Sequence, residues 1–403
     1  MAANGWRVVV FSVIAVAVNA AAPALAGPFA SGNLLVEQIT GTSGNATPIN
    51  ILEYTKSGSS VQTFSFPSSG ANQQTDSASA TSNGYINTYN GYLSVPGVNL
   101  ASGSTGAAAS NNKVNSILGV SGTVVTRTLF PTSGIMPYTG NNYRSSIATT
   151  GSTFYAAGTG SSNTGGIWYN DGTSFIQVSA TGAGLVNNMR NVEIYNNQLY
   201  FSSASGTFLG VSSLGTGLPT TAGQTAALQI NLGTGGSAYG FVMFDTNADN
   251  VLDRAYVADD GTTGINGGIN RFDFSSGAWS RTSAFRFDTS SGLLSSGTAA
   301  AGGSLVSIRG LTGTYDSLTS TASLFATTTE TSNNRLISFL DSGSLSTSTS
   351  FTTLAQAGTN QVFRGVDVAP VPEPSAFALA GLGIAAAGWS AWRRRVNGIP
   401  VKL

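Results

Sequence analysis

The chain has 403 residues, 17 basic and 17 acidic side chains, and neither cysteine nor histidine. The missing cysteine excludes disulfide bonds, zinc thiolate sites and a cysteine nucleophile. The missing histidine excludes a Ser-His-Asp triad and an imidazole base that titrates near neutral pH. Catalysis by this chain would therefore have to depend on carboxylates, lysine, tyrosine or a bound metal.

The first 26 residues have the pattern of a Sec signal peptide. A single basic residue, Arg7, precedes an apolar run over Val8–Val18, and Ala24-Leu25-Ala26 stands before Gly27. This order predicts an apolar signal helix and a cleavage site before Gly27. We therefore treat 27–369 as the exported body of the protein.

The exported body is poor in charge. It contains 12 basic and 16 acidic side chains, which give a net charge of about −4. No excess of basic residues is present to bind nucleic acid. Its surface must be covered mainly by Ser, Thr, Asn and Gly, and this composition suits a neutral, heavily hydrated setting such as polysaccharide.

Short β-rich runs separated by Gly, Ser and Asn turns fill the body and predict an all-β fold. One kind of run recurs at spacings of roughly 45 to 70 residues, and we interpret it as the second strand of a four-stranded unit. Its six copies start near Leu34, Tyr92, Phe154, Leu199, Ala255 and Leu324.

Units of this size predict the blades of a β-propeller, most simply with six blades. The first unit lacks an opening strand, because Gly32-Asn33-Leu34 starts directly with the second, and a surplus copy stands at Val362–Val368. Pairing of this C-terminal strand with Asn33–Val36 in the N-terminal blade would close the ring and remove its open edges. Seven blades are an alternative, since Thr75–Asn90 and Thr289–Gly303 could contain further strands. A β-helix and tandem sandwiches are alternatives to the propeller.

An arginine recurs at the same place in what we interpret as the innermost strands. The four copies are Arg144, Arg190, Arg309 and Arg364. In a propeller they would surround the central channel, where they could bind an anion or a sugar carboxylate. They could instead join neighbouring blades through hydrogen bonds to carbonyl groups and to acids such as Asp367 and Glu193. The repetition favours this structural role, because repeated positions usually serve the repeat.

One segment has the oxygen spacing of a calcium loop. Positions 1, 3, 5 and 9 of such a loop are Asp245, Asn247, Asp249 and Asp253. Position 6 is Asn250 instead of glycine, although asparagine tolerates the left-handed conformation needed there. Position 12 is Tyr256, so the bidentate glutamate is missing. The alternative is a polar hairpin loop. Calcium is the one possible cofactor that the sequence indicates.

Three weaker features have structural alternatives. Asp259-Asp260 before Gly261 predicts a tight turn that could add to the calcium loop. Trp168 and Trp279 could stack on sugar rings, but such aromatic residues more often pack between sheets. Scattered carboxylates such as Glu37 could form a glycosidase pair only if folding brought two of them within about 5–10 Å. Nothing in their spacing along the chain indicates such a pair.

The C-terminal segment 370–396 contains three elements in order. Val371-Pro372-Glu373-Pro374 is followed by eighteen uncharged residues, Ser375–Trp392, and then by Arg393-Arg394-Arg395. Eighteen helical residues span roughly 27 Å, close to the ~30 Å thickness of the hydrocarbon core of a membrane. The prolines mark the start of this transmembrane helix, and the arginines fit a cytoplasmic end. Residues 397–403 would then form a short cytoplasmic tail.

This order of elements resembles the PEP-CTERM sorting signal of Gram-negative bacteria. In that family an exosortase, a membrane-embedded transpeptidase, recognises and cuts the tail after Sec export. The resemblance implies insertion in the inner membrane before processing, and a cell-surface or extracellular destination afterwards. It implies no biochemical activity. An ordinary C-terminal membrane anchor is the alternative. The repeats of the body also look like those of uncharacterised bacterial surface proteins that bear the same tail.

Together, the tail, the missing histidine and the hydroxyl-rich composition favour a non-catalytic surface or matrix protein that scaffolds or binds extracellular polysaccharide, as in a biofilm. One alternative is a calcium-dependent hydrolase of the six-bladed lactonase type. Such an enzyme would need acidic and amide side chains from several inner strands to converge on the channel. Another alternative is a purely structural adhesin without a defined ligand.

Overall fold

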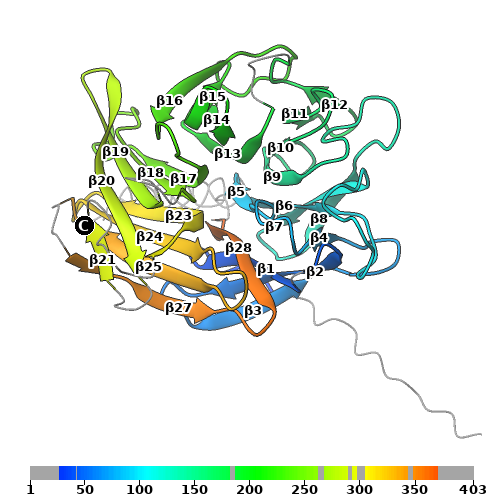
Figure 1. The fold of residues 1–403 in the computed structure, drawn as a ribbon, viewed down its shortest axis with the longest axis horizontal. Coiled ribbons are helices and arrows are strands. Elements are labelled where there is room, and N and C mark those ends of the chain that lie inside the picture. The colour runs from blue at the N-terminus through cyan, green and yellow to red at the C-terminus, as the bar shows by residue number, and fades with distance from the viewer. Residues whose placement is uncertain are drawn as a thin grey trace, which may run out of the picture.

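A computed structural model describes residues 27–41, 43–181, 187–261, 267–288, 293–296, 305–343 and 348–370. Within these ranges every regular element is a β-strand, and the paired strands are antiparallel (Figure 1). The predicted all-β class is therefore confirmed. The expected signal helix and C-terminal transmembrane helix lie outside the described ranges. A search of the described residues for a helix able to cross a membrane finds none.

The strands pair in runs of four. The first run is β28 (Gln361–Val368), β1 (Leu34–Thr40), β2 (Ala46–Tyr54) and β3 (Ser60–Ser65). The second is β5 (Asn87–Tyr89), β6 (Tyr92–Val98), β7 (Lys113–Gly119) and β8 (Val124–Leu129). The third is β9 (Tyr143–Ala148), β10 (Phe154–Gly158), β11 (Gly166–Asn170) and β12 (Phe175–Gln177). A short strand, β4 (Thr75–Ser77), joins the first two runs by pairing with both β2 and β6.

Three further runs follow along the chain. The fourth is β13 (Met189–Tyr195), β14 (Gln198–Ser205), β15 (Phe208–Leu214) and β16 (Ala226–Asn231). The fifth is β17 (Ala238–Phe244), β18 (Arg254–Asp259), β19 (Gly268–Ser275) and β20 (Ala278–Asp288). It is extended by β21 (Leu293–Ser296), β22 (Leu305–Val306) and β26 (Ser348–Ser350). The sixth is β23 (Ile308–Asp316), β24 (Thr321–Thr328), β25 (Arg335–Asp341) and β27 (Thr352–Gln356).

The second strand of each run starts within three residues of its predicted position. Local sequence explains several of these starts. Asn90-Gly91 joins β5 to β6, and Asn196-Asn197 joins β13 to β14, with all four residues at positive φ. Two-residue turns of this kind match the twist of the strands they connect, and asparagine and glycine adopt the required conformation most readily.

The runs are arranged around a common centre, and the first strand of each run lies nearest to it (Figure 1). These first strands are β28, β5, β9, β13, β17 and β23, and each contacts the next in this order, with β23 returning to β28. Buried apolar clusters fill the space between neighbouring runs. Ile117 and Phe154 share one such cluster between the second and third runs, and Val36 and Phe325 share another between the first and sixth.

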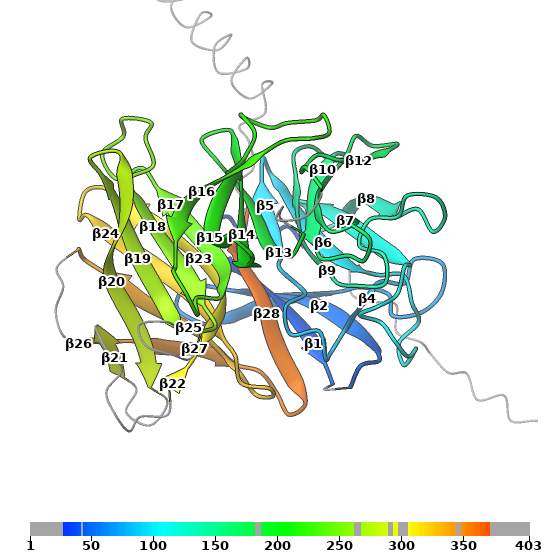
Figure 2. The same cartoon turned by 45° about the horizontal axis from the view of Figure 1, so that its top comes forward.

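The strand nearest the C-terminus of the body lies beside the strand nearest its N-terminus (Figure 2). Leu34 opposes Val368, and Val36 opposes Val366. A bulge follows Val36, and the pairing resumes at Gln38. The first run therefore takes its innermost strand, β28, from the far end of the body.

Introduced cysteines can test this register, because the chain has none of its own. Directly opposed residues of antiparallel strands have Cα atoms about 4.5–5.5 Å apart, which suits a disulfide, whereas diagonal neighbours lie about 7–8 Å apart. We expect the Val36→Cys/Val366→Cys variant to form an intramolecular disulfide on oxidation and the Val36→Cys/Val368→Cys control to form little.

Non-reducing gel electrophoresis and peptide mass spectrometry measure the yield. The cross-link closes a long loop, so it should raise the free energy of unfolding by up to about 5 kcal/mol. Equal yields from the two cysteine pairs would contradict the register of β1 and β28.

Candidate functional site

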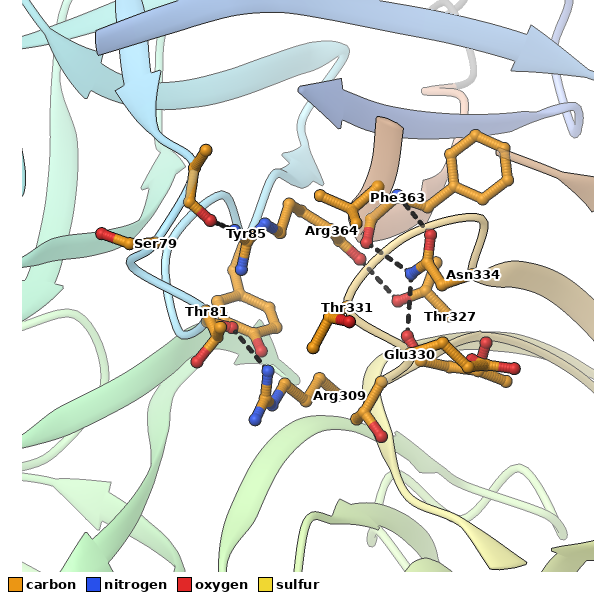
Figure 3. Close-up of a pocket in the computed structure, with 14 residues that line it drawn as sticks. Ser79, Thr81, Tyr85, Arg309, Thr327, Glu330, Thr331, Asn334, Phe363 and Arg364 are labelled. Atoms are coloured by element: carbon orange, nitrogen blue, oxygen red, sulfur yellow. Dashed lines mark hydrogen bonds between the residues drawn. The ribbon is translucent and has the colours of Figure 1, made fainter. Parts of the chain in front are cut away.

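A pocket of about 310 Å³ opens beside the centre of the molecule (Figure 3). It lies between β28, β23, the β24–β25 connection and the segment that leads from β4 to β5. Hydroxyl, amide, guanidinium and carboxyl groups contribute to its lining, among them those of Thr81, Tyr85, Arg309, Thr327, Glu330, Asn334 and Arg364. The pocket therefore offers several hydrogen-bonding groups, the aromatic rings of Tyr85 and Phe363, two cationic side chains and one acid.

The four recurring arginines all stand on first strands, as the repeat predicts. Arg144 donates to the carbonyl oxygen of Met189 at 3.0 Å and to the Asn188 side chain. Arg364 donates to the carbonyl oxygen of Ala78 at 2.7 Å. Three of the four arginines, Arg309 included, thus join separate segments through carbonyl groups or an acid, which is the structural role that the sequence favours.

Arg309 forms the one ion pair that these arginines make within the described residues. Its Nη2 lies 2.7 Å from an oxygen of Asp260, and its Nη1 donates to the carbonyl oxygen of Thr81 at 3.2 Å. The expected acids Asp367 and Glu193 do not serve as arginine partners. Each follows an arginine of its own strand by three residues, about 10 Å along a strand. Both acids therefore lie further along the first strands than the arginines do.

Two tyrosines that the sequence analysis did not single out pack among these arginines. The rings of Tyr85 and Tyr239 are 6.0 Å apart. The guanidinium carbon of Arg190 lies 4.0 Å from the centre of the Tyr239 ring, and that of Arg309 lies 5.2 Å from it. Tyr239 is the second residue of β17, as the recurring arginine is of β9, β13 and β23, so an alignment of the first strands could have found it. Tyr85 stands two residues before β5, and its N–H donates to the carbonyl oxygen of Arg144 at 3.0 Å.

Two buried acids, Glu37 on β1 and Asp76 on β4, lie beside Arg364. Glu37 is completely buried, and neither of its oxygens has a hydrogen-bond partner. Burial raises the pKa of Glu37 well above its usual value, the charge of Asp76 raises it further, and Arg364 opposes this. Burial also raises the pKa of Asp76, against hydrogen bonds from Asn83 and Ser77 and the charge of Arg364. Folding therefore brings together two carboxylates whose separation along the chain gave no sign of it.

The chain needs a glycine at position 84, where the backbone lies against Glu37 of this acid pair. Its φ is +81°, and a Cβ there would lie 2.4 Å from Oε1 of Glu37. Any side chain at this position would be strained and would displace the Glu37 carboxyl group.

A hydrogen-bonded network joins the first strands at another depth of the centre. Asn87 donates to Oγ of Ser145 at 3.0 Å and to Oδ1 of Asn191 at 3.1 Å, which links β5, β9 and β13. Asn191 donates in turn to Glu193 at 3.0 Å. Asp367 accepts from the backbone and the hydroxyl of Thr88 and from the hydroxyl of Thr312. Acids and amides from several inner strands thus do converge, although neighbouring donors already occupy them.

The predicted calcium loop is the connection between β17 and β18. Asp245 accepts backbone N–H groups from Ala248 at 2.7 Å and Asn250 at 2.8 Å, and Asp253 accepts from the hydroxyl of Thr246 at 2.8 Å. Asn250 has φ 66°, the left-handed conformation expected of it. Asn247 donates to Asp249 at 3.2 Å. No group of three acidic side chains within the described residues gathers as metal ligands would. Calcium binding by Asp245, Asn247, Asp249 and Asp253 stays a prediction.

Asp259-Asp260 does not add to this loop, and that expectation is wrong. The two residues stand at the opposite end of β18, about 20 Å away at the rise of a strand. Asp259 accepts the N–H groups of Ser237 and Gly261, both at 2.8 Å, and so forms the expected tight turn.

Both tryptophans pack within the fold. Trp168 is 2% exposed, and its Nε1 donates to the carbonyl oxygen of Thr164 at 3.0 Å. The rings of Trp279 and Phe274 lie 5.3 Å apart. Neither tryptophan lines the pocket.

Of the predicted sorting residues, the structure describes only Gly27. Gly27 is exposed, and its N–H donates to Oε1 of Gln62 at 2.7 Å. The rest of the predicted signal cleavage site, Ala24 and Ala26, lies outside the described residues. The same holds for Val371-Pro372-Glu373-Pro374 and Arg393-Arg394-Arg395.

Comparison with protein families identifies one segment of the chain. Residues 370–395 match the PEP-CTERM protein-sorting motif, which supports an exported protein sorted by an exosortase. No curated protein matches the chain.

Comparison with solved structures gives weak matches that include the following two. One is the hemagglutinin-neuraminidase ectodomain of parainfluenza virus 5, with a TM-score of 0.40, 10% identity, and coverage of 82% of this chain and 85% of that one. The other comes from work on two prolyl endopeptidases, with a TM-score of 0.34, 11% identity, and coverage of 79% of this chain and 42% of that one. Similarity at this level carries no argument about the fold or the activity of this chain.

The buried acid pair predicts how stability depends on pH. The folded-state pKa of Glu37 lies above the value of an exposed glutamate, about 4.3, so the folded protein holds this proton more tightly than the unfolded chain does. Its contribution to stability is full below about pH 4 and is lost as the pH rises toward the folded-state pKa. We expect Glu37→Gln to be more stable than wild type, by an amount that grows with pH over this range.

Urea unfolding at about pH 5 and about pH 8 measures this difference. Glu53→Gln is the matched control, because Glu53 is equally buried but accepts from Ala30, Asn33 and Gln62 at 2.6–2.8 Å. Glu53→Gln loses an acceptor of these hydrogen bonds, so this variant should have a free energy of unfolding lower by about 1–3 kcal/mol. A Glu37→Gln variant that is less stable than wild type at the higher pH would contradict the inference that the Glu37 side chain has no partner and holds its proton in the folded protein.

The calcium prediction has its own test. An ion that binds only the folded state raises the melting temperature by mass action, by the equivalent of about 2.7 kcal/mol at one hundred times its Kd. We expect calcium to raise the melting temperature of wild type, a chelator to reverse this, and Asp245→Ala to abolish it. Asp316→Ala is the control, since Asp316 also caps an exposed turn, by accepting from Leu318 at 2.9 Å. If calcium does not change the melting temperature of wild type, the calcium prediction is wrong and this segment is a polar hairpin loop.

Proposed function

We propose that residues 27–369 form a six-bladed β-propeller that β28 closes. Each blade is one run of four strands, and the apolar clusters are the contacts between blades. This proposal is supported by the ring of contacts among the six first strands. Within the described residues, the stretches that could have held a seventh blade contribute β4, β5 and β21, which pair with strands of the first, second and fifth runs.

The propeller is, in this proposal, a non-catalytic surface or matrix protein that binds or scaffolds extracellular polysaccharide. The sorting motif at 370–395 supports its export and its destination. The observation that carries the binding proposal is the central pocket, because sugars are recognised by hydroxyl, amide and charged side chains beside an aromatic ring. Its volume of about 310 Å³ lies near the lower end of the range for ligand pockets, about 300–1,000 Å³, and suits one sugar unit of a longer chain.

A lactonase-type hydrolase is the alternative with a specific observation behind it, namely the convergence of Asn87, Asn191, Glu193 and Asp367 at the centre. Burial raises the pKa of both Glu193 and Asp367. The oxygens of Asp367 accept hydrogen bonds from Thr88, Thr312 and the Val368 N–H. This engagement favours a structural role for the network over catalysis. A structural adhesin without a ligand remains the other alternative.

An array of extracellular polysaccharides, probed with the full chain, tests the proposal. Thr331 is exposed at the pocket, so Thr331→Trp should fill the space and reduce binding by about tenfold or more. Leu318→Trp is the control, because Leu318 is 95% exposed on the β23–β24 turn. Binding that neither variant changes would place any sugar site elsewhere. Turnover of a lactone panel, lost with a chelator, would replace the proposal with the hydrolase.

A further inference from the structure

We propose that the centre of the molecule binds a carboxylate group of an acidic sugar, a uronate, through Arg190, with Arg309 and Tyr85 beside it. This inference rests on the proposed polysaccharide binding and names the class of sugar. It starts from a cation that forms no ion pair among the described residues.

Arg190 has no polar partner among the described residues. Its Nε and Nη1 are buried without a hydrogen bond, and none of the ion pairs includes it. Its close neighbour is the face of Tyr239, at 4.0 Å. A cation–π contact offsets part of the desolvation of a guanidinium group but leaves its N–H donors unused. Buried donors of this kind call for an acceptor, which a bound anion would supply.

The surroundings of Arg190 are positively charged. Arg144 stands on the neighbouring first strand β9, and the charge of Arg190 helps burial to lower the pKa of Arg144 to about 9. Arg309 stands on β23, and its guanidinium group shares the Tyr239 ring with Arg190. Burial lowers the pKa of Arg190 as well, against the charge of Asp260. Arg309 already holds Asp260 through two N–H donors at 3.0 and 2.7 Å. Of Arg144, Arg190 and Arg309, only Arg309 therefore has an acid as its ion-pair partner among the described residues.

The unpartnered arginine is linked to the pocket through shared aromatic contacts. Arg190 and Arg309 both lie over Tyr239, and the Tyr239 ring is 6.0 Å from that of Tyr85. Tyr85 and Arg309 line the pocket, on the side shown with Thr81 in Figure 3. Arg190 itself is not among the residues that line the pocket. The proposal therefore places the sugar ring among the threonine hydroxyls and directs its charged group past Tyr85 and Arg309 toward Arg190.

The chemistry of the donor favours a carboxylate. A guanidinium group presents parallel N–H donors in one plane, which match the two oxygens of a carboxylate. A uronate carries that group on a ring whose hydroxyls the pocket can bind. Sulfate and phosphate esters are tetrahedral oxyanions, and a test must separate them from the planar group.

Isothermal titration calorimetry of the full chain, with glucuronate and an oligouronate as probes, tests the inference. Arg190→Gln should weaken binding of both by about tenfold or more and should not lower the melting temperature, because it removes a buried charge without a partner. Lys56→Gln is the matched control, since it removes a positive charge on the exposed β2–β3 turn and should leave binding unchanged.

The remaining outcomes separate this inference from the proposed function. Neutral polysaccharides that bind wild type and Arg190→Gln equally, with no binding of uronates, would overturn the inference and leave the proposed function intact. Sulfated or phosphorylated sugars that bind in place of uronates would also overturn it. Glucuronate that binds through Arg190, while no polysaccharide binds, would support the carboxylate site and overturn the proposed function.

Discussion

Pairing of β28 with β1 determines how the rest of the molecule is arranged. The first run starts with a strand that has no inner neighbour, and an open edge in that place would expose a row of unpaired backbone groups. β28 supplies the missing neighbour and buries Val366 against the cluster that also holds Leu34 and Val36. The same strand brings Arg364 and Asp367 to the centre. Since the chain lacks cysteine, this contact between distant segments depends on hydrogen bonds and burial alone.

The centre that results is polar and charged instead of apolar. Burying ionised groups is costly, so each must be paired, hydrogen-bonded or neutralised. Most are: Asp260 pairs with Arg309, Asp367 accepts from three neighbouring residues, and Asn191 holds Glu193. Glu37 and Arg190 are the exceptions, one an acid without a donor and the other a cation without an acceptor. Groups that a fold leaves unsatisfied in this way are candidates for function, because a proton or a ligand can complete them.

The outer surface and the centre have different physical characters, and this difference agrees with the proposed role. Turns rich in Gly, Ser, Thr and Asn cover the exterior, and only 8% of the residues of the chain are charged. Arg144, Arg190, Glu193, Arg309, Arg364 and Asp367 stand on the first strands, at the centre. In the proposed role, the hydroxyl groups of the exterior give solubility in a hydrated setting, and these charged side chains serve the confined site. Trp168 is buried in one apolar cluster, and Trp279, which is half-buried, packs against another.

The sequence by itself determined what is local or repeated. The order of elements at 370–395 gave the sorting motif, and the spacing of β-rich runs gave the positions of the second strands and of the four recurring arginines. The left-handed backbone conformation of Asn250 was predicted from its place in a tight turn, and the structure has it. These features depend on neighbours in the chain, so a pattern along the chain reveals them.

Only the tertiary structure decided which partners these residues meet. Glu37 and Asp76, Arg309 and Asp260, and Tyr85 and Tyr239 are each far apart in the chain, and no spacing rule relates them. The expected partners Asp367 and Glu193 were wrong because three residues along a strand change the depth at which a side chain reaches the centre. The reason is general: contacts between first strands depend on how whole sheets pack against one another, and that packing is a property of all the runs together.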